Sequence, residues 1–355
     1  MTINCFEVLK SDLTQTRSVA RSVDAIADGD ILCKVDRFAL TANNITYGVV
    51  GEKIGYWKFF PAEEVWGIIP VWGFADVVDS KHPDIKSGER LYGYFPMATH
   101  LVLRPENVKT TRLSDGMPHR AGLPPVYNSY ARTSAEANYD PAMDDARMLL
   151  FPLYATSFCL FDFLQDNDYF GATQIVTTSA SSKTAIGLAY ALGGDDLTNI
   201  GLTSPRNAAM VHDLDLYDNV ITYDRITDID NSLPTVIVDM SGDGTVLSDL
   251  HAHLGENMMY TSNVGITHYD ANEMGPHFIR DRSAMFFAPG HIQKRAKDWG
   301  PGEFEKKAMQ FWHDASMKSR EWLEFEHYSM SALPDVYQAV LAGKSSPDKG
   351  IIISV

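Results

Sequence analysis

The chain has 355 residues, is 45% hydrophobic and carries a formal net charge of -16 at pH 7. It is long enough for two domains, its composition excludes a disordered chain, and its acidity argues against nucleic acid or an anionic membrane as a partner. Three scattered cysteines fit a reducing compartment, the N-terminus lacks the pattern of a signal peptide, and no apolar run approaches about 20 residues. We therefore expect a cytoplasmic protein.

Short β-like segments separated by glycine-rich turns occupy residues 5–10, 30–40, 67–79 and 99–104. Such a series predicts a small, partly open barrel. Residues 113–145 break this rhythm, because they are rich in Pro, Tyr, Asn, Arg and Ala and show no sustained period. A loop of this length indicates an insertion, a lid or an interface element, and a packed surface excursion is the alternative.

From Arg147 the hydrophobic period becomes helical, and strands then alternate with helices. After the strand around Ile175, strands are predicted at residues 199–203, 219–223, 235–240, 258–262 and 283–288, with helices at 207–214 and 246–254. A helical tail at 301–326, a short helix at 334–341 and a strand at 350–355 end the chain. Strands separated by helices predict parallel βαβ units, and hence an α/β fold with a doubly wound parallel sheet of the Rossmann type.

The segment 174–194, QIVTTSASSKTAIGLAYALGG, is the centre of this prediction. An apolar strand runs into small residues and then into a helix, an arrangement that presents the helix N-terminus to a pyrophosphate. Ser179, Ser182 and Ala185 hold the positions at which the familiar fingerprint has glycine. The expected phosphate contacts are Ser181, Ser182, Lys183 and Thr184. The same pattern also occurs as ordinary packing in α/β sheets, and Lys183 fits a solvated helix start equally well.

Four segments together resemble a known superfamily. They are IKSGERLYG at 85–93, the serine-rich segment 174–194, residues 200–224 and the closing helix and strand at 336–355. In this order they resemble the medium-chain dehydrogenase/reductase superfamily, especially its zinc-free quinone-oxidoreductase and enoyl-reductase-like branch. The resemblance implies a GroES-like catalytic domain at 1–150, a Rossmann NADP-binding domain at 151–295 and a C-terminal return to the catalytic domain at 296–355. The serine-rich turn and the unmatched insertion 113–145 indicate a divergent subfamily.

The end of the second Rossmann strand predicts which nicotinamide is bound. An NAD site needs Asp or Glu there to accept from the ribose 2′-OH, whereas this chain has Thr203-Ser-Pro-Arg206. The Ser204 hydroxyl and the Arg206 guanidinium suit a 2′-phosphate, and so NADP(H) is favoured. The resemblance places Tyr223 on the adenosine side. Further cofactor contacts are expected at the carboxyl ends of later strands, from Ser241, Gly242, Asn263 and Gly265.

We expect no metal, because the cysteines lack ligand spacing and residues 68–78, IIPVWGFADVV, stand where zinc-dependent members carry G-H-E. The predicted reaction is hydride delivery from NADPH to an activated double bond, quinone or carbonyl of a small apolar substrate. The resemblance places 40–51 opposite the nicotinamide. Tyr47 is the first candidate proton donor, Asn44 an orienting group and Tyr56 the second candidate donor. Ordinary packing explains the same tyrosines, and the aromatic residues near Tyr56 either wall a substrate site or form core.

Two alternatives stay open at the level of sequence. One is a non-catalytic NADP(H)-binding protein, either a redox sensor or a structural protein like the crystallins derived from this superfamily. The other is a degenerate Rossmann domain that binds no nucleotide. Superfamily members commonly pair through the nucleotide domain, and so a homodimer is expected, with a small molecule and neither nucleic acid nor membrane as partner.

Overall fold

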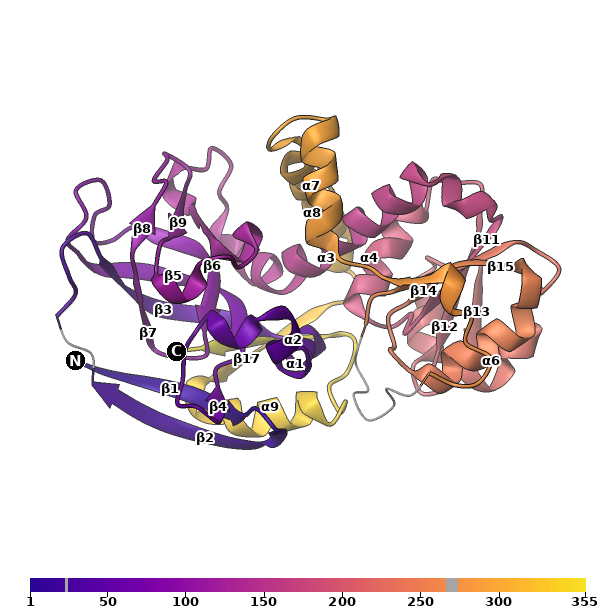
Figure 1. Cartoon of the computed structure of the whole chain (residues 1–355), viewed down its shortest axis with the longest axis horizontal. Helices are drawn as coiled ribbons and strands as arrows, with labels where there is room; N and C mark the ends of the chain where they lie inside the picture. Colours follow the sequence, from indigo (N-terminus) through magenta and orange to yellow (C-terminus); the bar gives the residue numbers. More distant parts are fainter. Residues whose placement is uncertain (23–24, 266–273) are drawn as a thin grey trace. The chain divides into compact units, whose positions relative to one another are not determined.

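The computed structural model describes residues 1–22, 25–265 and 274–355 (Figure 1). The chain divides into two compact units. Unit 1 comprises Met1–Leu149 and Glu324–Val355, and unit 2 comprises Leu150–Leu323.

Unit 2 is built on a six-stranded sheet in the order β13-β12-β11-β14-β15-β16, with every neighbouring pair parallel. In chain order the strands are β11 (Gln174–Thr178), β12 (Thr198–Thr203), β13 (Asn219–Thr222), β14 (Thr235–Asp239), β15 (Met258–Asn263) and β16 (Ser283–Met285). The first strand therefore lies beside both the second and the fourth, which is the order of a doubly wound dinucleotide-binding sheet. This confirms the predicted Rossmann sheet.

Successive residues of the central strands enter opposite hydrophobic cores of unit 2. Ile175 of β11 packs into a core with residues of α3 (Asp144–Asp166) and α4 (Lys183–Leu192), whereas its neighbour Val176 packs into a core with residues of α6 (Gly244–Leu254). Figure 1 shows these helices flanking the sheet. Because both faces are covered, the strands read as nearly continuous apolar runs, which explains why they could be predicted.

The remaining helices of unit 2 are α5 (Ala208–Asp213), α7 (Ala288–Asp298) and α8 (Glu303–Ser319). Phe304 and Ala308 of α8 form a buried cluster with Cys159 of α3. Residues 296–323, which we expected in the C-terminal return, therefore lie in unit 2. The predicted strand at 283–288 ends at Met285, and α7 was not predicted.

One segment, Pro141–Asp166, is long and apolar enough to cross a membrane by length and composition alone. We expected no such run. The segment meets the test because Asp162 is the one charged residue between Met148 and Phe163. A core helix of a soluble protein passes the same test, and 56% of its most apolar window is buried.

Unit 1 contains the strands of the expected partly open barrel, arranged in two sheets that are antiparallel except where β17 and β18 pair in parallel. The larger has the order β17-β18-β3-β5-β6-β10-β9-β8, with β7 also paired to β3, and the smaller has the order β2-β1-β4. The strands are β1 (Thr2–Leu9), β2 (Asp12–Ser22), β3 (Ile31–Leu40), β4 (Trp66–Gly67), β5 (Pro70–Ser80), β6 (Arg90–Pro96), β7 (His100–Leu103), β8 (Pro105–Glu106), β9 (Arg112–Asp115), β10 (Ser129–Arg132), β17 (Glu324–Ser329) and β18 (Lys349–Ser354). The helices α1 (Ala42–Val49), α2 (Gly51–Ile54) and α9 (Leu333–Leu341) complete it.

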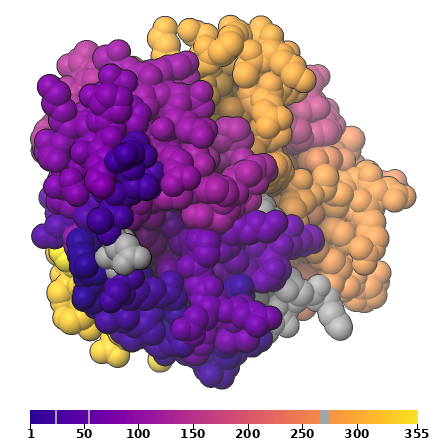
Figure 2. Space-filling view, turned by 60° about the vertical axis from the view of Figure 1, so that its left-hand side comes forward, coloured from indigo at the N-terminus to yellow at the C-terminus, as the bar shows by residue number. Residues whose placement is uncertain are grey.

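The segment 113–145 is integrated into unit 1. Its strand β10 pairs with both β6 and β9, and so it widens the large sheet. Arg120 is fully buried, and its Nε lies 2.9 Å from Asp115 Oδ2 while its Nη1 donates to the Tyr130 hydroxyl at 2.8 Å. Figure 2 shows the surface to which this part of the chain contributes, in the purple shades of residues 100–150.

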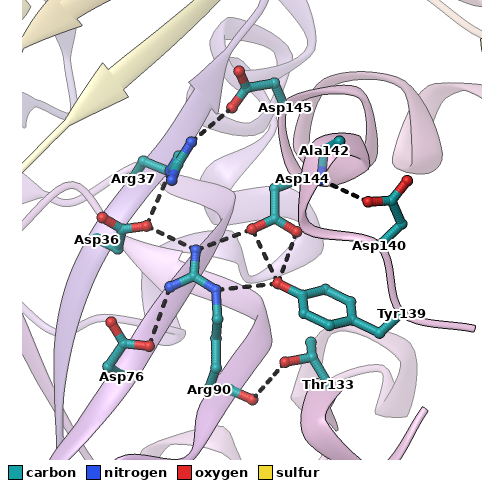
Figure 3. Close-up of polar contacts among 10 residues, drawn as sticks. All are labelled: Asp36, Arg37, Asp76, Arg90, Thr133, Tyr139, Asp140, Ala142, Asp144 and Asp145. Carbon is teal, nitrogen blue, oxygen red and sulfur yellow. Dashed lines mark hydrogen bonds and ion pairs between the residues drawn. The ribbon is translucent and has the colours of Figure 1, made fainter. Parts of the chain in front are cut away.

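A network around Arg90 of β6 attaches the end of this segment to the sheet (Figure 3). Arg90 Nη2 lies 2.7 Å from Asp36 and 3.1 Å from Asp144 at the start of α3, and Nη1 lies 3.1 Å from Asp76. Its Nε donates to the Tyr139 hydroxyl at 3.3 Å. Although burial lowers it, the pKa of Arg90 is raised, because the bonds to Asp36, Asp144, Tyr139 and Asp76 outweigh burial. Arg90 therefore stays charged, and its bond to Asp144 fixes the first turn of α3.

The link between α3 and β11 has an unusual backbone. Asp168, Tyr169, Phe170 and Gly171 have φ values of 50°, 47°, 54° and 75°. Phe170 stacks on Tyr260 of β15 with ring centroids 4.0 Å apart, and the Tyr169 hydroxyl donates to Asp195 at 2.5 Å. These contacts hold one left-handed turn, a conformation that L-residues seldom adopt in succession.

Candidate functional site

The predicted dinucleotide turn lies between β11 and α4 and is closed by its own hydrogen bonds. Ser179 adopts a left-handed backbone with φ 49°, and the Ser182 N–H donates to the Ser179 carbonyl at 2.7 Å. Ser182 is the N-cap of α4, where its hydroxyl accepts from the Ala185 N–H at 3.3 Å. The Ser179 N–H donates to the hydroxyl of Tyr223 at 2.9 Å. Tyr223 therefore lies against the turn.

Two residues that the sequence did not single out also support the turn. Asn207 donates its side-chain amide to the Ser181 hydroxyl at 2.9 Å. Tyr217 donates its hydroxyl to the Ala180 carbonyl at 3.2 Å, and its ring lies 2.9 Å from where Gly201 would carry a Cβ. Lys183 and Thr184 occupy the first turn of α4 and are half-buried. The serine-rich turn is thus held from outside by longer side chains, whereas a glycine-rich turn would approach its neighbours with backbone alone.

Ser204 and Arg206 follow β12 at the same edge of the sheet, since the carboxyl ends of parallel strands share one edge. Ser204 is half-buried and Arg206 is exposed. No carboxylate stands between Thr203 and Asn207. A cation and a hydroxyl, with no competing negative group in this loop, therefore occupy the position that distinguishes the two nicotinamide cofactors.

A buried carboxylate that sequence reasoning missed organises the next strand end. Asp239, the last residue of β14, accepts from the Thr178 hydroxyl at 2.6 Å and from the Ser241 hydroxyl at 2.7 Å. It also accepts from the N–H groups of Ser241 and Gly242, each at 3.0 Å. Burial raises the pKa of Asp239, and these bonds only partly offset the effect. Ser241 and Gly242, both predicted contacts, are thus positioned by Asp239.

The end of β15 lies against this loop. A Cβ at Gly265 would lie 2.0 Å from the Met240 carbonyl oxygen, so only glycine fits there. The N–H groups of Val264 and Gly265 donate to the Asp239 carbonyl at 2.8 and 3.0 Å. Asn263 Oδ1 is buried and has no hydrogen-bond partner among the residues that the structure describes. The structure therefore brings the predicted cofactor residues to one edge of the unit 2 sheet.

The three predicted catalytic residues belong to unit 1, and two of them, Asn44 and Tyr47, lie in α1. Asn44 is the N3 residue of a capping box, where its Oδ1 accepts from the Thr41 N–H at 2.8 Å. Its Nδ2 donates to the Pro70 carbonyl at 2.9 Å. Asn44 is thus used at both ends to fix α1 against β5. One turn along, Tyr47 accepts from the Asn43 side chain at 2.7 Å, and Asn43 was not predicted.

Tyr47 and Tyr56 lie in one buried aromatic cluster, with ring centroids 4.6 Å apart. We call this the tyrosine cluster; its members are Tyr47, Tyr56, Phe59, Trp72, Tyr94 and Tyr127. The Tyr56 hydroxyl donates to that of Tyr127 at 3.1 Å. Burial raises the pKa of Tyr47, and the polar groups of Trp72, Asn43 and Tyr94 oppose it. The phenol is therefore protonated at neutral pH and can serve as a proton donor.

Comparison with known sequences adds the family. Residues 38–346 match the model of one protein family. The chain belongs to the family described as protein of unknown function, DUF2855. A comparison of this DUF2855 chain with curated proteins gives no match.

Solved structures show the fold of this DUF2855 protein. CurA from Vibrio vulnificus is similar over 100% of this chain and 99% of its own, with a TM-score of 0.67 and 11% identity. CurA from the same organism in complex with NADPH has a TM-score of 0.64 and 12% sequence identity over 99% of each chain. A mutant form of enoyl thioester reductase from Candida tropicalis has a TM-score of 0.57 and 12% sequence identity over 100% of each chain. A putative NADPH:quinone reductase from Bacillus thuringiensis has a TM-score of 0.58 and 10% sequence identity, over 100% of this chain and 99% of its own.

These similarities span the whole chain, and both units are included. The DUF2855 chain therefore has the two-domain fold of the medium-chain dehydrogenase/reductase superfamily, in which a Rossmann domain accompanies a GroES-like domain. The resemblance drawn from the sequence is confirmed at the level of the fold, and the family assignment agrees with a divergent subfamily.

Proposed function

We propose that this protein is an NADPH-dependent, zinc-free reductase that delivers hydride to an activated double bond, quinone or carbonyl of a small apolar substrate. The observation that carries the proposal is the strand-end edge of unit 2. There a capped helix N-terminus, the Ser204–Arg206 loop and the glycine at 265 lie where a doubly wound sheet binds its dinucleotide. Two of the similar structures support it by name, one as an NADPH complex and one as a putative NADPH:quinone reductase.

The cofactor would be held in three places along this edge. Ser181, Ser182, Lys183 and Thr184 would meet the diphosphate, because the positive end of α4 favours an anion. Ser204 and Arg206 would hold the 2′-phosphate, with Tyr223 beside the adenosine. Ser241, Gly242, Asn263 and Gly265 would line the nicotinamide half, where the buried Asn263 Oδ1 can accept a hydrogen bond.

Bound NADPH would supply the hydride, and unit 1 would supply the proton. Tyr47 is our first donor, since its hydroxyl accepts from Asn43 and keeps its own hydrogen to give away. Tyr56 is the second donor. Asn44 would act by fixing α1, and Asn43 would orient the Tyr47 oxygen.

The first test is titration of the protein with NADPH and NADH, followed by cofactor fluorescence. Arg206→Ala should weaken NADPH binding roughly tenfold or more and leave NADH binding nearly unchanged, because the guanidinium would contact only the 2′-phosphate. Arg280→Ala, which removes another exposed arginine of unit 2, is the control and should alter neither. Equal losses for both cofactors would contradict the 2′-phosphate assignment, and no binding at all would leave the degenerate Rossmann alternative.

A non-catalytic NADP(H)-binding protein is the second candidate, favoured by the serine-rich turn whose Ser179 N–H is already bonded to Tyr223. Stopped-flow oxidation of NADPH against a panel of quinones and enones separates the two. NADPH binding without oxidation by any acceptor would favour the second candidate.

The cytoplasmic location and the homodimer remain part of this proposal. β16 pairs with β15, and its other edge has no partner strand within residues 1–22, 25–265 and 274–355. Met285 on this strand and Phe287 beyond it are 53% and 45% exposed. An open strand edge flanked by apolar side chains suits pairing with a second copy.

A further inference from the structure

A cleft of about 760 Å³ lies in unit 2, away from the strand ends that carry the predicted cofactor residues. Its walls come from the end of α4, the loop into β12, the loop before β13 and Lys318 of α8. Asp195 and Asp218 stand just before β12 and β13, and so the cleft lies at the amino ends of these parallel strands, at the opposite edge of the sheet. Its size falls within the range of about 300 to 1,000 Å³ that is usual for small-molecule sites.

Asn199, the second residue of β12, brings an unpartnered acceptor to this cleft. It lines the cleft and is 7% exposed, and its Oδ1 has no hydrogen-bond partner within the described part of the chain. Its Nδ2 donates to the Leu216 carbonyl at 3.2 Å, and because a carbonyl can only accept, this bond fixes which atom of the amide is the oxygen. A buried acceptor without a donor is costly, and native proteins seldom keep one without a reason. A ligand that completes this site therefore brings a donor.

The charge around the cleft is mainly negative. Asp195, Asp215 and Asp218 line it, and Lys318 opposes them with a single positive charge. The Lys318 Nζ lies 5.6 Å from the ring centroid of Tyr190, which also lines the cleft. The end of α4 adds to the negative potential, because the carbonyl end of a helix carries a partial negative charge. The cleft therefore attracts a cation, and its acceptors suit a cation that carries N–H groups.

The three carboxylates do not converge on one point. Asp195 accepts from the Tyr169 hydroxyl at 2.5 Å, and Asp218 accepts from the Asn199 backbone N–H at 2.7 Å. Among the residues described by the structure, no group of three His, Cys, Asp or Glu side chains could hold a metal ion. Divalent ions need several oxygen ligands at about 2.0 to 2.6 Å from one centre. A cation with its charge distributed over several positions therefore matches these carboxylates better than a metal ion does.

We propose that this cleft binds an aliphatic polyamine, whose ammonium groups pair with the three carboxylates and donate to Asn199 Oδ1. The rings of Tyr190 and Tyr217 line the cleft and offer apolar surface to the methylene segments between the ammonium groups. Tyr217 also donates its hydroxyl to the Ala180 carbonyl, and so the ligand contacts a side chain that supports the serine-rich turn. The inference does not depend on NADPH binding, because the cleft lies at the opposite edge of the sheet.

The test uses spermidine as the probe and the full chain, with binding followed by isothermal titration calorimetry at physiological ionic strength. We expect one saturable site. Asp215→Asn should weaken spermidine binding about fivefold, as expected for one exposed ion pair. Asn tolerates the left-handed backbone of residue 215, which has φ 54°. Asp213→Asn removes the same charge from an exposed carboxylate outside the cleft and should leave the affinity nearly unchanged.

Gly194 lines the cleft and allows a variant that blocks it. Nothing lies within 4 Å of a Cβ added at this position, and so a longer side chain fits there. Gly194→Lys brings a tethered ammonium to the carboxylates and should weaken spermidine binding by about tenfold or more, because an intramolecular competitor acts at a high effective concentration. Gly194→Gln has a similar reach and no charge, and it should weaken binding far less.

Equal spermidine affinity in wild type, Asp215→Asn and Gly194→Lys would overturn the inference, because binding would then lie elsewhere on the acidic surface. The absence of a saturable site in the wild type would overturn it as well. Displacement of spermidine by Mg²⁺ at the same concentration would assign the cleft to metal ions instead. In a crystal structure of the complex, a spermidine nitrogen should lie at Asn199 Oδ1, and a water molecule in its place would contradict the proposal.

Discussion

The strand-end edge of unit 2 and the tyrosine cluster of unit 1 treat buried polar groups in opposite ways. At the edge, the two oxygens of Asp239 accept four hydrogen bonds, and the largely buried turn before α4 is held by Tyr223. In the cluster, the Trp72 indole N–H and the Tyr94 hydroxyl make no hydrogen bond of full geometry within the described chain, and the Tyr47 hydroxyl is the polar group beside them. The difference indicates that hydrogen bonds hold the edge in shape, whereas ring packing holds the cluster.

The largest expected effect comes from a substitution at the strand-end edge of unit 2, and it tests whether this edge is rigid. Gly265→Ala should destabilise the protein by about 3 kcal/mol, because the added carbon meets the Met240 backbone, which cannot swing aside. Urea unfolding would measure this. Gly194→Ala, where nothing lies within 4 Å of the added carbon, is the control and should change little. Wild-type stability for Gly265→Ala would mean that the edge is pliable.

Replacing the central carboxylate tests the same edge through its hydrogen bonds. Asp239→Asn should cost about 2 to 3 kcal/mol, since an amide nitrogen cannot accept and would face the buried donors that Asp239 now satisfies. The same unfolding measurement applies. Asp230→Asn changes an exposed carboxylate that accepts from Ser232, and its effect should stay below about 0.5 kcal/mol. Similar losses in both variants would refute the importance of the Asp239 network.

His251 of α6 is a buried polar group of unit 2 that, like Asp239, has hydrogen-bond partners. Its Nδ1 accepts from the Ile279 N–H at 2.8 Å, and its Nε2 lies 2.9 Å from the Thr261 hydroxyl. Burial, aided by Arg282, lowers the pKa of His251 to about 4, against an ordinary value of 6.5. On acidification the unfolded chain takes up a proton near pH 6.5, and the folded chain does so only near pH 4.

Stability should therefore fall between these two values as the pH falls. The contribution of His251 from pH 7 to pH 5 is about 2 kcal/mol. Urea unfolding at both values should show this loss in the wild type and not in His251→Gln. An equal pH dependence in the two proteins would contradict the buried, neutral imidazole.

The smallest effect sharpens the comparison within unit 1. Tyr130 and Tyr94 are both fully buried, but the Tyr130 hydroxyl donates to the Tyr94 carbonyl at 2.7 Å and accepts from Arg120. Tyr130→Phe should cost about 1 kcal/mol, and Tyr94→Phe should cost less, because the Tyr94 hydroxyl has only its imperfectly aligned contact with the Tyr47 hydroxyl to lose. Thermal unfolding of the two variants side by side measures the difference. A cost for Tyr94→Phe equal to that for Tyr130→Phe would show that the hydroxyl is bonded.

Much of unit 2 could be predicted from the sequence, for a physical reason. Its parallel strands are buried on both faces and are therefore apolar runs, and the carboxyl ends of such strands meet at one edge. The positions of Ser204, Asn263 and Gly265 follow from these two facts. The role of Asp239 does not, because it depends on Thr178, which lies far away in the sequence and beside it in the sheet.

Unit 1 was harder to predict, because its contacts depend on register. β10 has four residues and no period, and its place in the sheet is set by pairing with β6 and β9. Residues 324–326 were assigned to a helical tail, yet β17 begins at Glu324 and pairs with β18. The aromatic residues near Tyr56 were noted from the sequence, whereas Trp72 and Tyr94 became a pair only when the strands were aligned.

The left-handed turn at residues 168–171 has a backbone conformation that suits D-amino acids better than L-amino acids. Three L-residues other than glycine hold positive φ there, each at roughly 1 to 2 kcal/mol. Mirror-image residues favour that region without such a cost. In a chain assembled by chemical ligation, D-alanine at position 168 should therefore be tolerated or even stabilising. The same replacement within α3, one turn earlier, should disrupt the helix.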